Sequence, residues 1–118
     1  MRFFLKKADR ILKRSEFVAL SSSTSRKIHT DLFIALVAPS RGKGPRLGVT
    51  VSRKVGGAVQ RNRIKRLARE FFRLNRHQLK GCWDINLIAR RNASAQPNPV
   101  IYQSLKNLFE AISRQFEG

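Results

Sequence analysis

The sequence predicts a single-domain α+β sandwich in which helices cover one side of a small sheet of about four strands. Short segments with the alternating or continuous apolar pattern of strands are interleaved with longer segments whose apolar residues recur every three or four positions, as in helices. In addition, 118 residues are enough for one modest core and too few for two. We therefore expect residues 1–118 to form one domain, with the order helix, strand, strand, helix, strand, helix.

The first predicted helix follows a basic N-terminal segment. Residues 1–14 are rich in Lys and Arg and lack a clean period, so we expect a flexible basic arm. Ser15 is then well placed to cap a short helix that carries Phe17 and Leu20. The run of Ser and Thr over residues 21–25 ends this helix in a polar loop.

Three segments have strand patterns. Residues 32–38 are apolar on both faces and stop at Pro39, whereas residues 47–51 alternate between apolar residues and small or hydroxyl residues. Because only a short Gly-containing loop separates these two strands, they are close enough in sequence to form a hairpin. The third strand is expected over residues 84–89, after a turn at Lys80-Gly81.

Two longer segments have helical periods. The first runs from about residue 59 to residue 75 and follows the flexible pair Gly56-Gly57. Its predicted core residues are Ile64, Leu67, Ala68, Phe71 and Leu74. The second begins at Asn98-Pro99, where the asparagine is expected to cap the helix and the proline to take the first helical position. Its apolar stripe consists of Ile101, Leu105, Leu108, Phe109, Ile112 and Phe116.

The charge of the chain indicates a polyanionic partner. Lys and Arg number 25 against 7 Asp and Glu, which gives a formal net charge of +18. The apolar content is too high for a disordered basic tail, so a folded RNA or DNA binder is expected. No apolar stretch approaches the roughly 20 residues of a membrane span, and no signal-peptide pattern follows Met1. We therefore expect a cytoplasmic protein with no membrane partner.

The first of the two longer helices separates its charges from its apolar residues. At about 100° per residue, its core residues lie within about 60° of Ile64, and polar residues fill an arc roughly 100° wide on the far side. These polar residues are Asn62, Lys65, Arg66, Arg69, Arg73 and Arg76. A solvated helix face is the alternative, but such a face usually mixes acids and bases, and here only Glu70 offsets the repulsion. Phosphate binding is therefore favoured, because arginine donates paired hydrogen bonds to phosphate oxygens.

The sequence offers little for protein-based catalysis. A nuclease site would need converging carboxylates for a metal ion or a histidine pair for acid and base. The acids show no close pair with metal-site spacing, and His29 and His77 are far apart in the chain. Cys82 is the only cysteine, so an intramolecular disulfide is excluded. We expect no catalytic residue and no metal ligand in the protein.

Two adjoining motifs carry a resemblance to a known family. They are the strand Arg46–Lys54, followed by a short glycine-containing loop, and the helical motif Arg61–Phe71. Together they resemble the bacterial ribonuclease P protein family, and the resemblance extends with lower specificity over nearly the whole chain. It implies a ribosomal-protein-like fold with a left-handed crossover through the basic helix, against the usual right-handed rule.

The resemblance also implies an activity and partners. The chain would be the protein subunit of ribonuclease P, an endoribonuclease that removes the 5′ leader from precursor tRNA. Its partners would be the ribonuclease P RNA and precursor tRNA, with no DNA. The protein would bind no cofactor by itself, and Mg²⁺ held by the RNA would activate the attacking water.

Residue roles follow from the same resemblance. The residues implied to bind the catalytic RNA are Arg53, Lys54, Arg61, Asn62, Arg63, Lys65, Arg66, Arg69 and Arg73. The single-stranded leader would lie in a cleft between the sheet and the N-terminal helix. The cleft residues would be Phe17, Phe33, Ala35, Thr50 and Ser52, with the ring of Phe17 stacking on an unpaired base. Family members often have further aromatic residues where this chain has Ser21 and Ala35, so either fewer bases would stack here or Phe33 would substitute. The alternative for Phe17 is that it anchors its helix to the core.

Two other functions fit the composition. A ribosomal or assembly protein would bind a structured RNA, and a nucleoid protein would bind duplex DNA. The ordered motif Arg61–Phe71 argues against the first, and the lack of a recognisable helix-turn-helix pair argues against the second. Retention of single-stranded leaders, specificity for one structured RNA, or indifferent duplex binding would distinguish the three.

Overall fold

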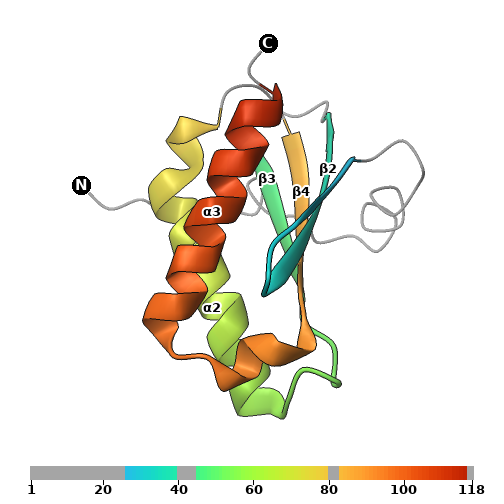
Figure 1. Cartoon of the computed structure of the whole chain (residues 1–118), viewed down its shortest axis with the longest axis vertical. Helices are drawn as coiled ribbons and strands as arrows, with labels where there is room; N and C mark the ends of the chain where they lie inside the picture. Colours follow the sequence, from blue (N-terminus) through green and yellow to red (C-terminus); the bar gives the residue numbers. More distant parts are fainter. Residues whose placement is uncertain (1–25, 40–44, 80–82, 117–118) are drawn as a thin grey trace.

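The computed structural model describes residues 26–39, 45–79 and 83–116, and these form a four-stranded sheet with two long helices (Figure 1). The strands are β1 (Arg26–His29), β2 (Phe33–Pro39), β3 (Arg46–Thr50) and β4 (Trp83–Ala89). The helices are α2 (Ala58–Asn75), α3 (Asn98–Phe116) and the short 3₁₀ helices η2 (Arg76–Gln78) and η3 (Arg91–Ala95). The α+β class is confirmed. The predicted basic arm and the first predicted helix, with Phe17, lie outside the described residues.

The strand order β1-β2-β4-β3 corrects the predicted hairpin. β2 pairs antiparallel with β1 and β4, whereas β3 pairs in parallel with β4 and with no other strand of the described residues. β4 lies between β2 and β3, and its middle residues Ile85, Asn86 and Leu87 are all buried, as expected of a central strand. The hairpin is instead made by β1 and β2. Sequence analysis missed β1 because three of its four residues are exposed and give no apolar pattern.

The connection from β3 through α2 to β4 is a left-handed crossover. In Figure 1 both strands run downward, α2 lies in front of the sheet, and β4 lies to the right of β3. This hand is the rare one for parallel strands, and it agrees with what the family resemblance implies.

Both long helices cover the same face of the sheet, and the core lies between them and the strands (Figure 1). The strand residues of this core alternate along the chain, as the pleat requires. On β2 they are Phe33, Ala35 and Val37, which are at most 1% exposed. The opposite face of the sheet carries a separate apolar cluster of Leu36 with Ala38 and Ile88.

The buried stripe of α2 is rotated from its predicted position. Ile64, Ala68 and Phe71 are buried as expected, but Leu74 is 43% exposed and Phe72 is fully buried. Phe72 lies about 80° from Ile64 around the helix, and its ring meets Phe109 of α3 edge to face at 6.2 Å. The stripe rotates because α2 contacts both β3 and α3, so its buried arc is wider than the period suggests.

α3 buries its predicted stripe from Ile101 to Ile112. It begins at Asn98, so Pro99 is the second helical residue rather than the first. Among the described residues, no helix is long and apolar enough to cross a membrane.

Candidate nucleic-acid interface

The outward side of α2 carries the cations that the sequence placed there. We call Asn62, Lys65, Arg66, Arg69 and Arg73 the basic face. Asn62 and Arg66 are exposed, and Lys65 is half-buried. Within the described part of the chain, these three side chains make no hydrogen bond or ion pair, whereas Arg73 donates to Glu70 at 3.0 Å. The first half of the basic face is therefore open to an anion.

The start of α2 adds uncapped N–H groups beside this face. Gly57 is the N-cap residue, its backbone is extended, and no side chain caps the helix. The first turn contains no acidic residue either. A Cβ atom on Gly57 would meet nothing within 4 Å, so the approach to these N–H groups is clear. A helix start of this kind favours an anion through its free donors and its partial positive charge.

Arg61 lies on the flank of α2 that turns toward Phe72, about 60° from Ile64. Its side chain is half-buried, and its Nε–H is buried without a hydrogen-bond partner among the described residues. A buried donor left unpaired costs about 1–3 kcal/mol. Among the described residues, the side chain of Arg61 therefore makes no hydrogen bond that an RNA contact would have to break.

Arg63 has the opposite surroundings. Its Nε donates to Gln60 Oε1 at 3.0 Å and its Nη1 to Asn98 Oδ1 at 2.7 Å. Its Nη2 donates to the carbonyl oxygens of Ser94 and Gln96, both at 3.1 Å. Sequence analysis grouped Arg63 with the RNA contacts, but the structure shows it bound within the protein, between the start of α2 and the start of α3.

Arg53 and Lys54 occupy the exposed turn after β3. The turn is closed by a hydrogen bond from the amide of Val55 to the carbonyl of Ser52 at 3.0 Å. The carbonyl of Val55 in turn accepts from Ser94 Oγ at 2.6 Å, which fixes the end of the turn just before α2. Both cations are therefore presented close to the uncapped helix start.

Two of the predicted cleft residues are in the wrong place for a ligand. Phe33 and Ala35 are both 0% exposed and face the helices, so neither can touch a leader. The reason is the pleat of β2, which directs every second residue to each face. Thr50 and Ser52 are exposed, as a ligand site requires.

Sequence analysis missed the residues that share with Thr50 the sheet face opposite the two long helices. Thr50 pairs with Ile88 in register, and its hydroxyl donates to Asn86 Oδ1 at 3.0 Å. Leu36 lies opposite Asn86 on the neighbouring strand. Arg46 and Asp84 close one end of this face with two hydrogen bonds of 2.8 Å. The pattern of residues 32–38 could have placed Leu36 on this face only if the sheet order had been known.

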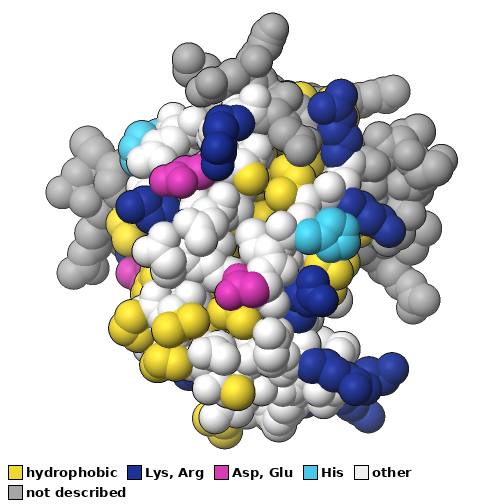
Figure 2. Space-filling model, in the orientation of Figure 1, with side chains coloured by type: hydrophobic (Ala, Val, Ile, Leu, Met, Phe, Trp, Pro, Cys, Tyr) yellow, Lys and Arg dark blue, Asp and Glu magenta, His cyan; other side chains and the backbone are white. Residues whose placement is uncertain are grey.

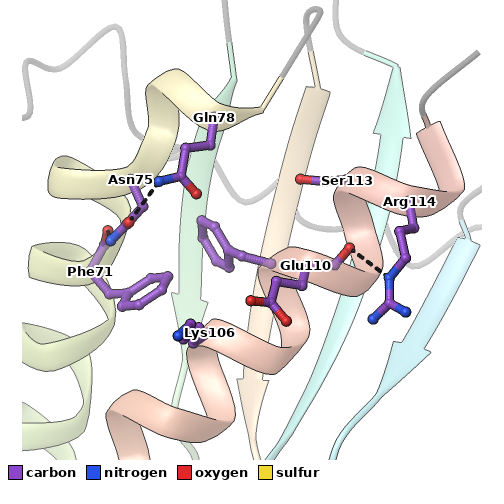
Figure 3. Close-up of a pocket in the computed structure, with 8 residues that line it drawn as sticks. Phe71, Asn75, Gln78, Lys106, Glu110, Ser113 and Arg114 are labelled. Atoms are coloured by element: carbon purple, nitrogen blue, oxygen red, sulfur yellow. Dashed lines mark hydrogen bonds between the residues drawn. The ribbon is translucent and has the colours of Figure 1, made fainter.

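The side of the molecule over α3 is less basic. Figure 2 shows mostly uncharged surface there, with Lys and Arg toward its margins. A hollow of about 520 Å³ lies between the ends of α2 and α3 (Figure 3). Its floor includes Phe71 and Phe109, whose rings meet edge to face at 4.9 Å. Lys106, Glu110 and Arg114 give its rim mixed charge.

Tyr102, on α3, has a shifted pKa. Burial raises the pKa of Tyr102 above its ordinary value, Glu70 raises it further, and Arg73 opposes the shift. His29 lies on β1 and His77 in η2. No group of three or more His, Cys, Asp or Glu side chains that could hold a metal ion occurs among the described residues.

Comparison with known proteins gives one consistent result. A family model described as Ribonuclease P matches residues 5–113. The ribonuclease P protein component of Desulfosudis oleivorans is 47% identical over 114 residues, which cover 97% of this chain and 93% of the relative. That of Desulfatibacillum aliphaticivorans is 48% identical over 111 residues, with coverages of 94% and 93%.

Solved structures agree with the sequence relatives. The RNase P protein of Staphylococcus aureus has a TM-score of 0.83 at 31% identity and covers 89% of this chain and 95% of its own. The RNase P protein of Thermotoga maritima has a TM-score of 0.78 at 28% identity, with coverages of 92% and 98%. The similarity therefore extends over the fold of most of the chain.

Proposed function

This chain belongs to the ribonuclease P protein family, and from this premise we propose that α2 binds the catalytic RNA while the sheet face opposite the two long helices binds the 5′ leader of precursor tRNA. The protein is a subunit of ribonuclease P and has RNA as its partner. The assignment of one surface to each RNA rests on the exposure, charge and hydrogen bonds of the residues concerned.

The open first half of the basic face carries the proposal for RNA docking. Lys65 and Arg66 have no partner among the described residues, and like charges on one helix repel unless an anion lies against them. Arg61, Arg53 and Lys54 extend the same cationic surface around the uncapped start of α2. A phosphate there would accept from arginine forks and from backbone N–H groups together.

The sheet face opposite the two long helices offers groups that suit a single strand. Thr50 and Ser52 are its exposed polar residues, whose hydroxyl groups can contact bases or sugars, whereas Leu36 and Asn86 are buried and support the face from within. Replacing Thr50 by valine keeps the shape and removes the hydroxyl. We expect about two- to fivefold weaker binding of leader-bearing tRNA, with binding of mature tRNA unchanged. Equal losses for both tRNAs would contradict a leader contact.

Catalysis is assigned to the RNA rather than to the protein. Mg²⁺ ions held by the RNA would activate water for attack on the phosphodiester. The protein cations would help by lowering the repulsion between two polyanions, the catalytic RNA and the precursor. The expected place of action is the cytoplasm, where precursor tRNA is processed.

The test is cleavage of precursor tRNA at low Mg²⁺ by a bacterial ribonuclease P RNA, with and without this protein. We expect mature 5′ ends only when protein and RNA are both present, and weaker stimulation by Arg66→Ala. Lys106→Ala, on α3, is the matched control and should stimulate normally. Cleavage by the protein alone would overturn the assignment of catalysis to RNA.

A competition measurement separates specific RNA binding from general polyanion binding. Excess duplex DNA should compete poorly with ribonuclease P RNA at physiological salt, since non-specific binding is weak there. Equal competition by duplex DNA would favour the nucleoid-type alternative.

A further inference from the structure

The guanidinium of Arg63 joins α2, which carries the proposed RNA-binding surface, to η3 and to the start of α3. It is held by Gln60 on its own helix, by the carbonyls of Ser94 and Gln96, and by the side chain of Asn98. Ser94 belongs to η3 and Asn98 is the first residue of α3. These bonds use all but one of the N–H groups of the guanidinium.

A second contact supports the same junction from the other side of the helix start. Ser94 Oγ donates to the carbonyl of Val55 at 2.6 Å. A Cβ atom on Gly56 would lie 3.3 Å from Gln60 Cβ and 3.5 Å from Ser94 Cβ, so the backbone there is tightly packed. The segment from Ser94 to Asn98 therefore holds both the turn before α2 and the first turn of α2 itself.

The position of Arg63 on α2 differs from that of the basic face. It lies about 100° from Ile64, on the flank toward α3, whereas Asn62 and Arg66 lie about 160° from Ile64 in either direction. For a phosphate to receive a paired hydrogen bond from Arg63, the bonds to Asn98 or to the two carbonyls would have to break. Two buried or half-buried carbonyls would then lose their donors, which opposes the exchange.

We propose that Arg63 is a positioning residue, which fixes the start of α2 against the start of α3 and so sets where Asn62, Lys65 and Arg66 meet the RNA. This inference rests on the proposed RNA-binding role of α2. Arg63 acts through Asn98 and the carbonyls of Ser94 and Gln96, and it neutralises no phosphate.

The dependence of RNA binding on salt separates positioning from phosphate contact. Each phosphate contact adds to the slope of log affinity against log salt, so removing one lowers the slope by about one. The experiment measures binding of the full chain to an in-vitro transcribed ribonuclease P RNA over a salt series. Arg66→Ala should lower the slope by about one, whereas Arg63→Ala should weaken binding about tenfold and leave the slope unchanged.

Conservative variants separate a loss of positioning from a general loss of stability. Arg63→Lys keeps the charge but loses the planar fork, so it should bind as weakly as Arg63→Ala if positioning is the role. Asn98→Ala should reproduce the weaker binding, and Asn98→Asp, which keeps the acceptor oxygen, should restore it. In the double variant Arg63→Ala/Asn98→Ala the two losses should not add, because the residues act as a pair.

The outcomes distinguish the two proposals. If the unsubstituted protein fails to bind the RNA, the proposed function fails. If it binds and Arg63→Ala lowers the slope as Arg66→Ala does, or if Arg63→Lys binds normally, only the positioning role is overturned. Normal affinity of Arg63→Ala would overturn it as well.

Discussion

Arg61 and Arg63 are separated by one residue on α2, yet only Arg63 is bound within the protein. Helical periodicity places them on opposite flanks, and that much could be predicted from sequence. The partners of Arg63 could not, because they are carbonyl oxygens 31 and 33 residues further along the chain. Nothing in a local pattern shows which loop will pack beside a helix. A motif read from sequence therefore identifies candidate contacts without separating binding residues from supporting ones.

The unpaired Nε–H of Arg61 leads to a prediction in which stability and binding change independently. Methionine can fill the space of the arginine stem without a buried donor, so Arg61→Met should leave the free energy of unfolding within about 0.5 kcal/mol or raise it. Binding to ribonuclease P RNA should weaken. Urea denaturation and filter binding on the same preparation measure both quantities, and a parallel loss of both would show that Arg61 is structural.

Tyr102 is the only tyrosine, so its titration can be followed directly by absorbance. Burial, then Glu70, raise its pKa above about 10. Because the folded pKa is the higher one, the stability that Tyr102 contributes is fully present below about pH 10 and is lost as the pH rises through the folded value. Glu70→Gln should lower this pKa part of the way. An unchanged titration curve would exclude the Glu70 interaction.

At the scale of the element, α2 shows why a helical period locates a core only approximately. The period gave Ile64, Ala68 and Phe71 correctly, because these lie at the centre of the buried arc. At the margins of this arc it chose Leu74 over Phe72, because the period alone does not show which flank of the helix the rest of the fold covers. The strands show the same limit: the alternation of β2 was visible, but its inward set was known only once the helices were placed.

A matched pair of substitutions on α2 tests the corrected core. Phe72→Ala removes a fully buried ring and should lower the free energy of unfolding by about 3–5 kcal/mol. Leu74→Ala removes a side chain that is 43% exposed and should cost less than about 1 kcal/mol. Chemical denaturation monitored by circular dichroism compares the two, and equal costs would support the original stripe.

At the scale of the whole molecule, the repulsion between positive charges opposes folding. A net charge of +18 on 118 residues favours expansion through self-repulsion, so an anion that binds the native surface should stabilise it. The fold class could be predicted from the apolar patterns and the charge from composition, but the sheet order could not, because it depends on pairings between distant segments.

Inorganic phosphate at a few millimolar tests this balance, since it is too dilute to act through general solvent effects. We expect Tm to rise by about 3 °C relative to chloride at the same ionic strength. The double variant Lys65→Ala/Arg66→Ala should show a smaller rise, because the open half of the basic face is lost. The same rise in both proteins would mean that phosphate acts elsewhere.

The parallel pairing of β3 with β4 has a consequence for the order of folding. The β1-β2 hairpin is local and can form early. β3 can pair with β4 only after the segment between them, which includes α2, has closed into a loop. Detachment of α2 from the sheet should therefore expose the amide hydrogens of β3 to exchange with solvent. An RNA that holds α2 in place would thereby also protect an edge strand that it need not touch.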